Sequence, residues 1–224
     1  AFPHVYATVF SGFYIALMLL LVALIFRALS IEFRNQVESD TWKKVWDLAF
    51  SISSLVVALL LGVALGNIFT GVPVDSSMNY TGSFFTLLRP IPLFVGLTGV
   101  AMLTMQGGAY LLMKTEGGLY TKVQGWLKKS WLVFVVLTVL TTLLTAVLNF
   151  SKVSLVITSG LGWLAIVLLL AGIVAVPMFL KKEENFKVFI SSSVIILAMF
   201  SIVAVTIFPN LVPALDAVNS LNIY

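Results

Sequence analysis

The sequence is poor in the residues that most often carry chemistry in proteins. Among its 224 residues there is no cysteine, one histidine and only 10% charged side chains. The lack of cysteine excludes disulfides and thiolate metal sites within this chain. A soluble domain carries roughly a quarter charged residues, so the low charge content argues against a soluble globular protein.

Long hydrophobic runs make up most of the chain, since 60% of the residues are hydrophobic and the mean hydropathy is +1.10. Runs of about 18 or more apolar residues can cross the hydrocarbon core of a bilayer. Only helices and closed barrels do so with every backbone group hydrogen-bonded, and barrel strands alternate apolar and polar residues. The stretch 156–170 shows no such alternation. The sequence therefore predicts an all-α integral membrane protein with a single transmembrane domain over residues 1–224.

Six transmembrane helices are predicted in this domain. Their approximate ranges are 5–26, 48–68, 87–113, 130–148, 155–180 and 189–208.

The basic residues predict the orientation of these spans. Eleven of the thirteen follow the first, third and fifth spans, and they are Arg27, Arg34, Lys43, Lys44, Lys114, Lys122, Lys128, Lys129, Lys181, Lys182 and Lys187. Cytoplasmic loops carry an excess of lysine and arginine, so we expect both termini, Ala1 and Tyr224, on the external face. Because the basic residues lie at membrane boundaries, the net charge of +4 does not indicate binding to nucleic acid.

Two patterns predict contacts between helices. Gly62 and Gly66 form a GxxxG motif, which lets two helices approach closely. Threonines at 138, 141, 142 and 145 share one face of the fourth span. Their hydroxyl groups can bond back to their own helix or across to a neighbour. Packing is the simpler interpretation of both patterns.

Few side chains in the predicted spans could carry chemistry by themselves. No ionisable residue falls near mid-membrane, where ion-coupled carriers usually keep one, and the polar residues there, such as Gln106, are neutral. Haem iron needs His, Met, Cys or Tyr ligands, and the single histidine, His4, falls at the edge of the first span. We therefore expect this chain to ligate no haem or other metal unaided.

Asp47, which follows Trp46 at the cytoplasmic start of the second span, is the carboxylate of most interest. One interpretation is a helix-end residue, because the positive end of a helix dipole favours a carboxylate. The other is a residue that handles protons or supports assembly at the edge of a buried site. Glu32, Glu38 and Asp40 are expected to be solvated partners of the basic residues in the same loop.

Several stretches resemble subunit II of the cytochrome bd quinol oxidases. They are FSGFYIA at 10–16 with Phe26-Arg27, WKKVWD at 42–47, GVALGN at 62–67, YTGSFFTLL at 80–88, QGGAY at 106–110, FPNLVP at 208–213 and SLNIY at 220–224. Their order and spacing over the first half of the chain carry the resemblance.

The resemblance implies an eight-helix subunit built from two four-helix bundles, of which this chain would hold the second to the seventh span. Such oxidases of the prokaryotic cytoplasmic membrane pass electrons from quinol to oxygen and form water. Their b and d haems and main quinol site belong to subunit I. Subunit II is implied to stabilise that haem assembly, to contribute to proton and oxygen access, and to be inactive alone. Its implied partners are subunit I, small accessory subunits, lipid and quinone, including a structural quinone.

Three residues take roles from the resemblance. Asp47 matches an aspartate linked to haem-site integrity, and Glu32 matches an acidic residue near the cytoplasmic proton entrance. Arg27 matches the arginine that closes its span. Gln36 departs from the family, which can place a basic residue near that entrance.

Two other functions remain open on sequence grounds. A small-solute transporter or permease would need a midplane substrate site, often with broken helices. Pro90, Pro92 and Pro177 could break helices, but all lie near span ends. A purely structural subunit of some other membrane complex is the third interpretation.

Overall fold

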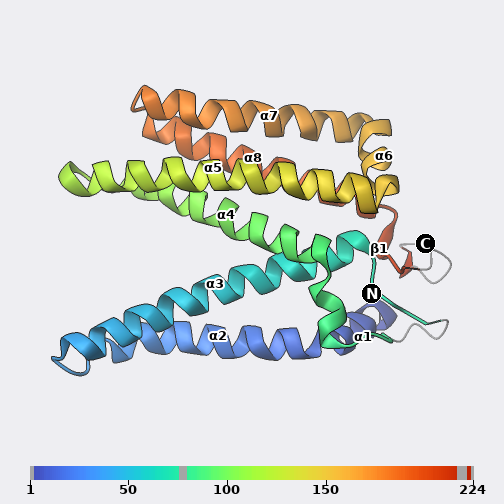
Figure 1. Cartoon of the computed structure of the whole chain (residues 1–224), viewed down its shortest axis with the longest axis horizontal. Coiled ribbons are helices and arrows are strands. Elements are labelled where there is room, and N and C mark those ends of the chain that lie inside the picture. The colour runs from blue at the N-terminus through green and yellow to red at the C-terminus, as the bar shows by residue number, and fades with distance from the viewer. Residues whose placement is uncertain (1–2, 76–79, 216–220, 223–224) are drawn as a thin grey trace. The chain divides into compact units, whose positions relative to one another are not determined.

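The structure, a computed structural model, is helical along most of the chain and describes residues 3–75, 80–215 and 221–222 (Figure 1). Its helices are α1 (Pro3–Gly12), α2 (Tyr14–Phe33), α3 (Asp40–Thr70), the 3-10 helix η1 (Phe84–Leu88), α4 (Pro90–Leu112), α5 (Gly117–Leu148), α6 (Phe150–Thr158), α7 (Gly160–Lys181) and α8 (Asn185–Ile207). Two short strands, β1 (Asn210–Val212) and β2 (Leu221–Asn222), pair in a small sheet. Six helices, namely α2, α3, α4, α5, α7 and α8, are long and apolar enough to cross a membrane. The predicted all-α class with six transmembrane helices is confirmed.

Several helices extend beyond the predicted spans. The helix α2 continues to Phe33, α3 begins at Asp40 and α5 begins at Gly117, where the sequence suggested 26, 48 and 130. At about 1.5 Å per residue, the 32 residues of α5 reach about 48 Å, well beyond a hydrocarbon core of about 30 Å. The spans were predicted from apolar runs, which stop at the first charged residues, whereas the helices continue through those residues.

The first predicted span begins differently, because Phe13 leaves the helical conformation (φ −97°, ψ 12°) and separates α1 from α2. The termini Ala1 and Tyr224 lie outside the described residues, as does the side chain of His4. The single transmembrane domain and the eight-helix, two-bundle arrangement stay predictions.

The chain forms two compact units, and the first contains Ala1–Gly96 and Val212–Asn222. In this unit α2 packs along α3, and η1 also contacts α3. A small apolar cluster lies at the end opposite the α2–α3 turn (Figure 1) and contains Phe13, Val72, Val74, Leu87 and Val212. Backbone hydrogen bonds between Val72 and the 213–215 segment close this end.

The glycine motif of α3 brings two helix backbones together, as the sequence predicted. A Cβ atom added to Gly62 would lie only 2.7 Å from the Cα atom of Gly96, in the first part of α4. One added to Gly66 would lie 2.6 Å from the Cα atom of Pro92. Since real Cβ contacts are never this short, only glycine allows α3 and α4 to pack this closely.

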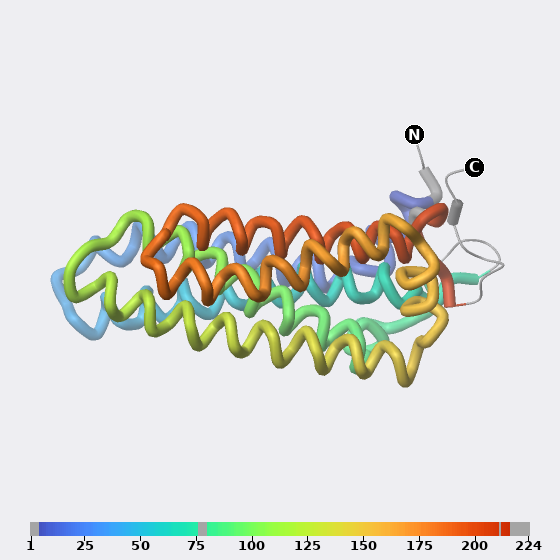
Figure 2. Tube along the Cα trace, turned by 90° about the horizontal axis from the view of Figure 1, so that it is seen from above, coloured from blue at the N-terminus to red at the C-terminus, as the bar shows by residue number. Residues whose placement is uncertain are grey.

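The second unit contains Leu97–Leu211 and Ile223–Tyr224, and therefore most of α4 with α5 to α8. The helices α7 and α8 run side by side over their length (Figure 2), and α6 packs against α5, α7 and α8. The core contains fully buried side chains such as Met105, Leu127, Phe134, Val188 and Ile195. This unit thus has a larger apolar core than the small cluster of the first.

The threonine face of α5 makes both kinds of bond that the sequence predicted. Thr138, Thr142 and Thr145 donate to the carbonyl oxygens four residues earlier at 2.8 Å. The hydroxyl of Thr141 instead lies 2.9 Å from that of Thr98, on α4.

Gln106 links α4 to α8 in the same unit. Its Nε2 donates to Ser193 Oγ at 3.0 Å, and Ser192 donates to its Oε1. Both polar ends of this amide are therefore hydrogen-bonded within the protein.

The glycine contact yields a direct test. We expect Gly62→Val to destabilise the detergent-solubilised protein by about 1–3 kcal/mol, because the added atoms overpack the α3–α4 contact. The midpoint of thermal unfolding measures this. The matched control is Gly107→Val, since an added Cβ at Gly107 meets nothing within 4 Å. An equal effect of the two substitutions would contradict the close approach.

Candidate functional site

The turn between α2 and α3 carries the residues that the sequence singled out. Arg34 follows the end of α2, and Asp47 lies two turns into α3. The guanidinium Nε donates to Asp47 Oδ1 at 2.6 Å, and Nη2 donates to Oδ2 at 3.3 Å. This two-pronged geometry suits the planar arginine fork and fixes the orientation of the carboxylate.

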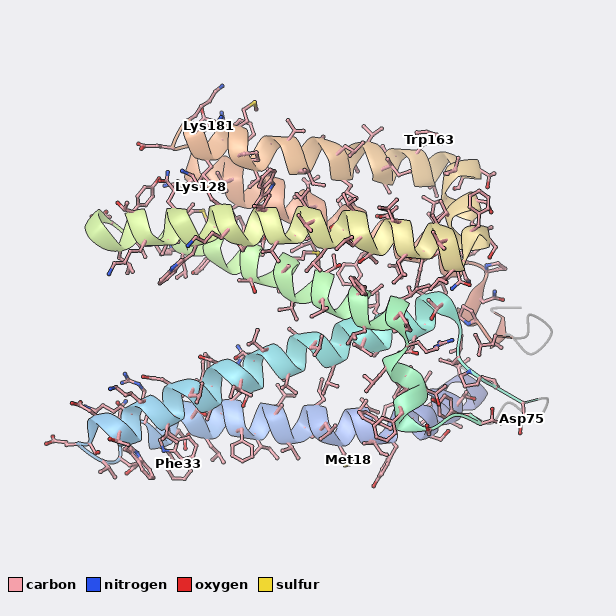
Figure 3. The ribbon with its side chains drawn as sticks, viewed as in Figure 1. Met18, Phe33, Asp75, Lys128, Trp163 and Lys181 are labelled. Carbon is pink, nitrogen blue, oxygen red and sulfur yellow. The ribbon has the colours of Figure 1, made fainter. Side chains whose placement is uncertain are left out.

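Three aromatic side chains of the same two helix ends contact one another. Trp42 Nε1 donates to the carbonyl oxygen of Phe33 at 2.6 Å. The ring of Trp46 lies between them, with centroids 5.2 Å from Phe33 and 5.7 Å from Trp42. Figure 3 labels Phe33 at the end of α2, beside the start of α3. These contacts join the two helix ends, while the buried Nε1 of Trp46 has no hydrogen-bond partner in the described part of the chain.

The electrostatics of the pair are those of an exposed contact. The hydrogen bond to Asp47, followed by the attraction of its charge, raises the pKa of Arg34 above its usual value. Both side chains remain about half exposed, at 44% for Arg34 and 55% for Asp47. Solvent screens such pairs, which contribute little to stability. This contact therefore matters less for stability than for the orientation that it gives to the Asp47 carboxylate.

The partner of Arg34 differs from the sequence expectation. Glu32, Glu38 and Asp40 were expected to pair with the basic residues of this loop, but Arg34 pairs with Asp47. The reason is geometric: residues 13 apart meet because the chain reverses between α2 and α3. The sequence pointed to Asp47 but missed Arg34, whose only signal was its place at the opposite end of a short turn.

The other two candidates lie near this pair without joining it. The guanidinium carbon of Arg27 lies 5.5 Å from the ring centroid of Phe50, a cation–π arrangement between α2 and α3. Glu32 and Gln36 are exposed, and Glu32 forms no ion pair with any described residue. The structure thus brings Asp47 together with Arg34, and leaves Glu32 free on the surface.

A second polar centre lies at the other end of α3, around Arg89. Its Nη2 donates to Asn67 Oδ1 at 3.2 Å, to Thr70 Oγ1 at 3.2 Å and to the Gly71 carbonyl at 2.5 Å. Burial lowers the pKa of Arg89. The fully buried Asn67 also donates to the carbonyl oxygens of Val63 and Leu87, at 2.9 and 2.7 Å. This centre ties the segment after α3 to η1.

The described residues hold no cluster of metal-ligating side chains. They contain no group of three or more His, Cys, Asp or Glu side chains that could hold a metal ion. The buried methionines Met102 and Met105 belong to the apolar core of the second unit. The expectation that this chain ligates no haem stays a prediction.

Six helices of this length and apolarity define a multi-pass α-helical membrane protein. Over residues 1–224 the chain matches the family model for cytochrome bd terminal oxidase subunit II. It therefore belongs to that family, and it is a multi-pass protein of the inner membrane.

Known relatives agree with this assignment. The chain is 43% identical over 128 residues to cytochrome bd-I ubiquinol oxidase subunit 2 of Escherichia coli (strain K12), covering 55% of this chain and 34% of that protein. It is 46% identical over 123 residues to a probable cytochrome oxidase subunit 2 of Haemophilus influenzae, covering 53% and 32%. For cytochrome bd ubiquinol oxidase subunit 2 of Bacillus subtilis the identity is 32% over 124 residues, covering 55% and 37%. The matched segments thus span about a third of each relative.

The Arg89 centre generates a stability prediction. Asn67→Ala should destabilise the protein by about 1–3 kcal/mol, because the Leu87 carbonyl and the Arg89 guanidinium lose a buried partner. The shift in the thermal unfolding midpoint reports this cost. Asn35→Ala, at an exposed position of the α2–α3 turn, is the control and should change little. Equal midpoints for the two variants would contradict the role given to Asn67.

Proposed function

We propose that this chain acts as the supporting subunit of a quinol:oxygen oxidoreductase. In this proposal a larger partner subunit holds the b and d haems and the main quinol site. The present chain ligates no haem, stabilises the haem assembly of the partner and contributes to proton and oxygen access. It has no activity alone. The family match over the whole chain supports the oxidase, and no observation favours a transporter.

The roles that we propose for individual residues depend on one observation, the Arg34–Asp47 pair. Both carboxylate oxygens of Asp47 accept hydrogen bonds from the Arg34 guanidinium, which fixes the orientation of the carboxylate. About half of the Asp47 side chain is nevertheless exposed, so a partner subunit or a water chain can reach it. We assign to Asp47 the support of the haem site, with Arg34 as the residue that positions it.

Glu32 and Arg27 complete this region in the proposal. Glu32 carries an exposed carboxylate without an ion pair among the described residues, which suits an acceptor for protons arriving from the cytoplasm. Arg27 holds the last turns of α2 against Phe50 of α3. The excess of basic residues around this turn and the two turns after α4 and α7 supports placing all three on the cytoplasmic side. Both termini would then be external.

The complete complex is proposed to contain further components. Small accessory subunits, bound lipid and a structural quinone are consistent with the broad exposed apolar surface of α2, α5 and α7, on which Leu21, Leu143 and Leu170 are each at least half exposed.

The proposal is tested by changing Asp47 in the full-length protein, together with its partner subunit. Asp47→Asn keeps the size of the side chain but removes its charge. We expect haem content or oxidase activity to fall about tenfold or more, the scale seen when groups that support a metal site are lost. Visible spectra of the purified complex and oxygen uptake with quinol measure the two effects.

Two further variants separate the carboxylate from the ion pair. Arg34→Gln breaks the same contact but leaves the carboxylate, so a smaller loss is expected. Asp40→Asn, in the first turn of α3 and without an ion pair among the described residues, should behave as the unmodified protein. Unchanged spectra and turnover in Asp47→Asn would contradict the proposed role and leave Asp47 as a carboxylate that only stabilises the start of α3.

A further inference from the structure

A pocket in the second unit is not explained by the proposed oxidase role. It has a volume of about 750 Å³, within the range of about 300–1,000 Å³ typical of small-molecule sites. Its lining comes from the α4–α5 turn, from Tyr120 on α5 and from the α7–α8 turn. The α4–α5 turn extends beyond the α7–α8 turn in both views (Figures 1 and 2). The pocket therefore occupies the step between the two hairpin ends.

One wall of this pocket is held in place by side-chain hydrogen bonds among three helices. Tyr120 donates its hydroxyl proton to Asn185 Oδ1 at 3.1 Å, which links α5 to α8. Asn185 Nδ2 donates to the carbonyl oxygen of Leu112 at 3.3 Å, which links α8 to α4. Since both groups are half-buried, the bonds fix the relative positions of the three helix ends. This wall of the pocket is thus held in one arrangement by hydrogen bonds.

The lining carries charges of both signs. Lys114 and Glu116 come from the α4–α5 turn and Glu183 comes from the α7–α8 turn. None of the three forms an ion pair with another described residue. A simple anion would meet two carboxylates, and a simple cation would meet the ammonium group of Lys114. A ligand with a positive and a negative group satisfies both.

The depth of the pocket in the membrane identifies the source of such a ligand. The 22 residues of α7 extend about 33 Å at 1.5 Å per residue, close to the hydrocarbon thickness of about 30 Å. The α7–α8 turn, next to Lys181 in Figure 3, therefore lies at the level of lipid headgroups. Met113, which is half-buried in the lining just after the end of α4, offers an apolar surface for the start of an acyl chain.

We propose that this pocket binds the zwitterionic headgroup of an aminophospholipid. Lys114 binds the phosphate, and Glu116 and Glu183 bind the ammonium group. The hydrogen-bonded wall of Tyr120 and Asn185 keeps these charges at the mouth of the pocket. The lipid would bridge the α4–α5 and α7–α8 hairpins and hold the ends of the second unit together.

The test uses the full-length protein purified in mild detergent with the subunits that stay bound to it. After delipidation it is mixed with micelles that contain palmitoyl-oleoyl phosphatidylethanolamine, phosphatidylglycerol or phosphatidylcholine, and bound lipid is counted by native mass spectrometry. We expect preferential retention of phosphatidylethanolamine. Lys114→Gln and Glu183→Gln should each weaken its binding up to about fivefold, the effect of losing one exposed ion pair. Lys122→Gln and Glu38→Gln, which change charges outside the lining, are the matched controls.

Competition on the unmodified protein keeps the test valid if a variant fails to fold. Glycerophosphoethanolamine should displace the lipid, whereas sodium phosphate at the same concentration should not. Equal retention of phosphatidylglycerol, or equal displacement by phosphate, would show a plain anion site and overturn the proposal. Retention of no lipid would overturn it too. So would cross-linking of a single-cysteine Lys114→Cys probe to a segment of another subunit that covers the pocket, and the absence of native cysteine makes that probe specific.

Discussion

The structure depends first on the absence of water in the hydrocarbon core, where every polar group must find its partner within the protein. The serine and threonine hydroxyls of the spanning helices meet this constraint mainly by bonding to a carbonyl three or four residues earlier, as Ser53 and Thr104 do. Such bonds hold no helices together. Among the described residues, several of the side-chain contacts that do so lie at helix ends, where charged and amide groups can reach water or one another.

The two units solve the packing problem differently. In the first, the backbones of α3 and α4 approach so closely at Gly62 and Gly96 that little side-chain surface is needed between them. In the second, large side chains such as Phe134 and Met105 fill a continuous core, with the Gln106 amide as a polar link to α8. Close packing and interhelical hydrogen bonds are the main sources of helix association in a membrane, because lipid supplies no hydrophobic drive.

Sequence patterns predicted the features that depend on local spacing. Hydropathy found the six spans, the small residues at 62 and 66 indicated a close contact between two helices, and the threonine face of α5 was identified by its period. Features that depend on how turns bring distant residues together were not predicted. The Arg34–Asp47 pair, the Arg89 centre and the pocket at Asn185 each join segments at least 13 residues apart. The helix ends were also predicted wrongly, because the first charged residues of a loop do not mark where the backbone hydrogen bonds of a helix end.

In the proposed function, this chain is one part of an oxidase whose redox centres lie in another subunit. The most direct measurement is therefore the visible spectrum and subunit composition of the full-length protein, isolated from membranes in mild detergent. We expect absorption from b and d haems together with a larger haem-bearing subunit. An intact, colourless protein that purifies without such a partner would contradict the proposed function.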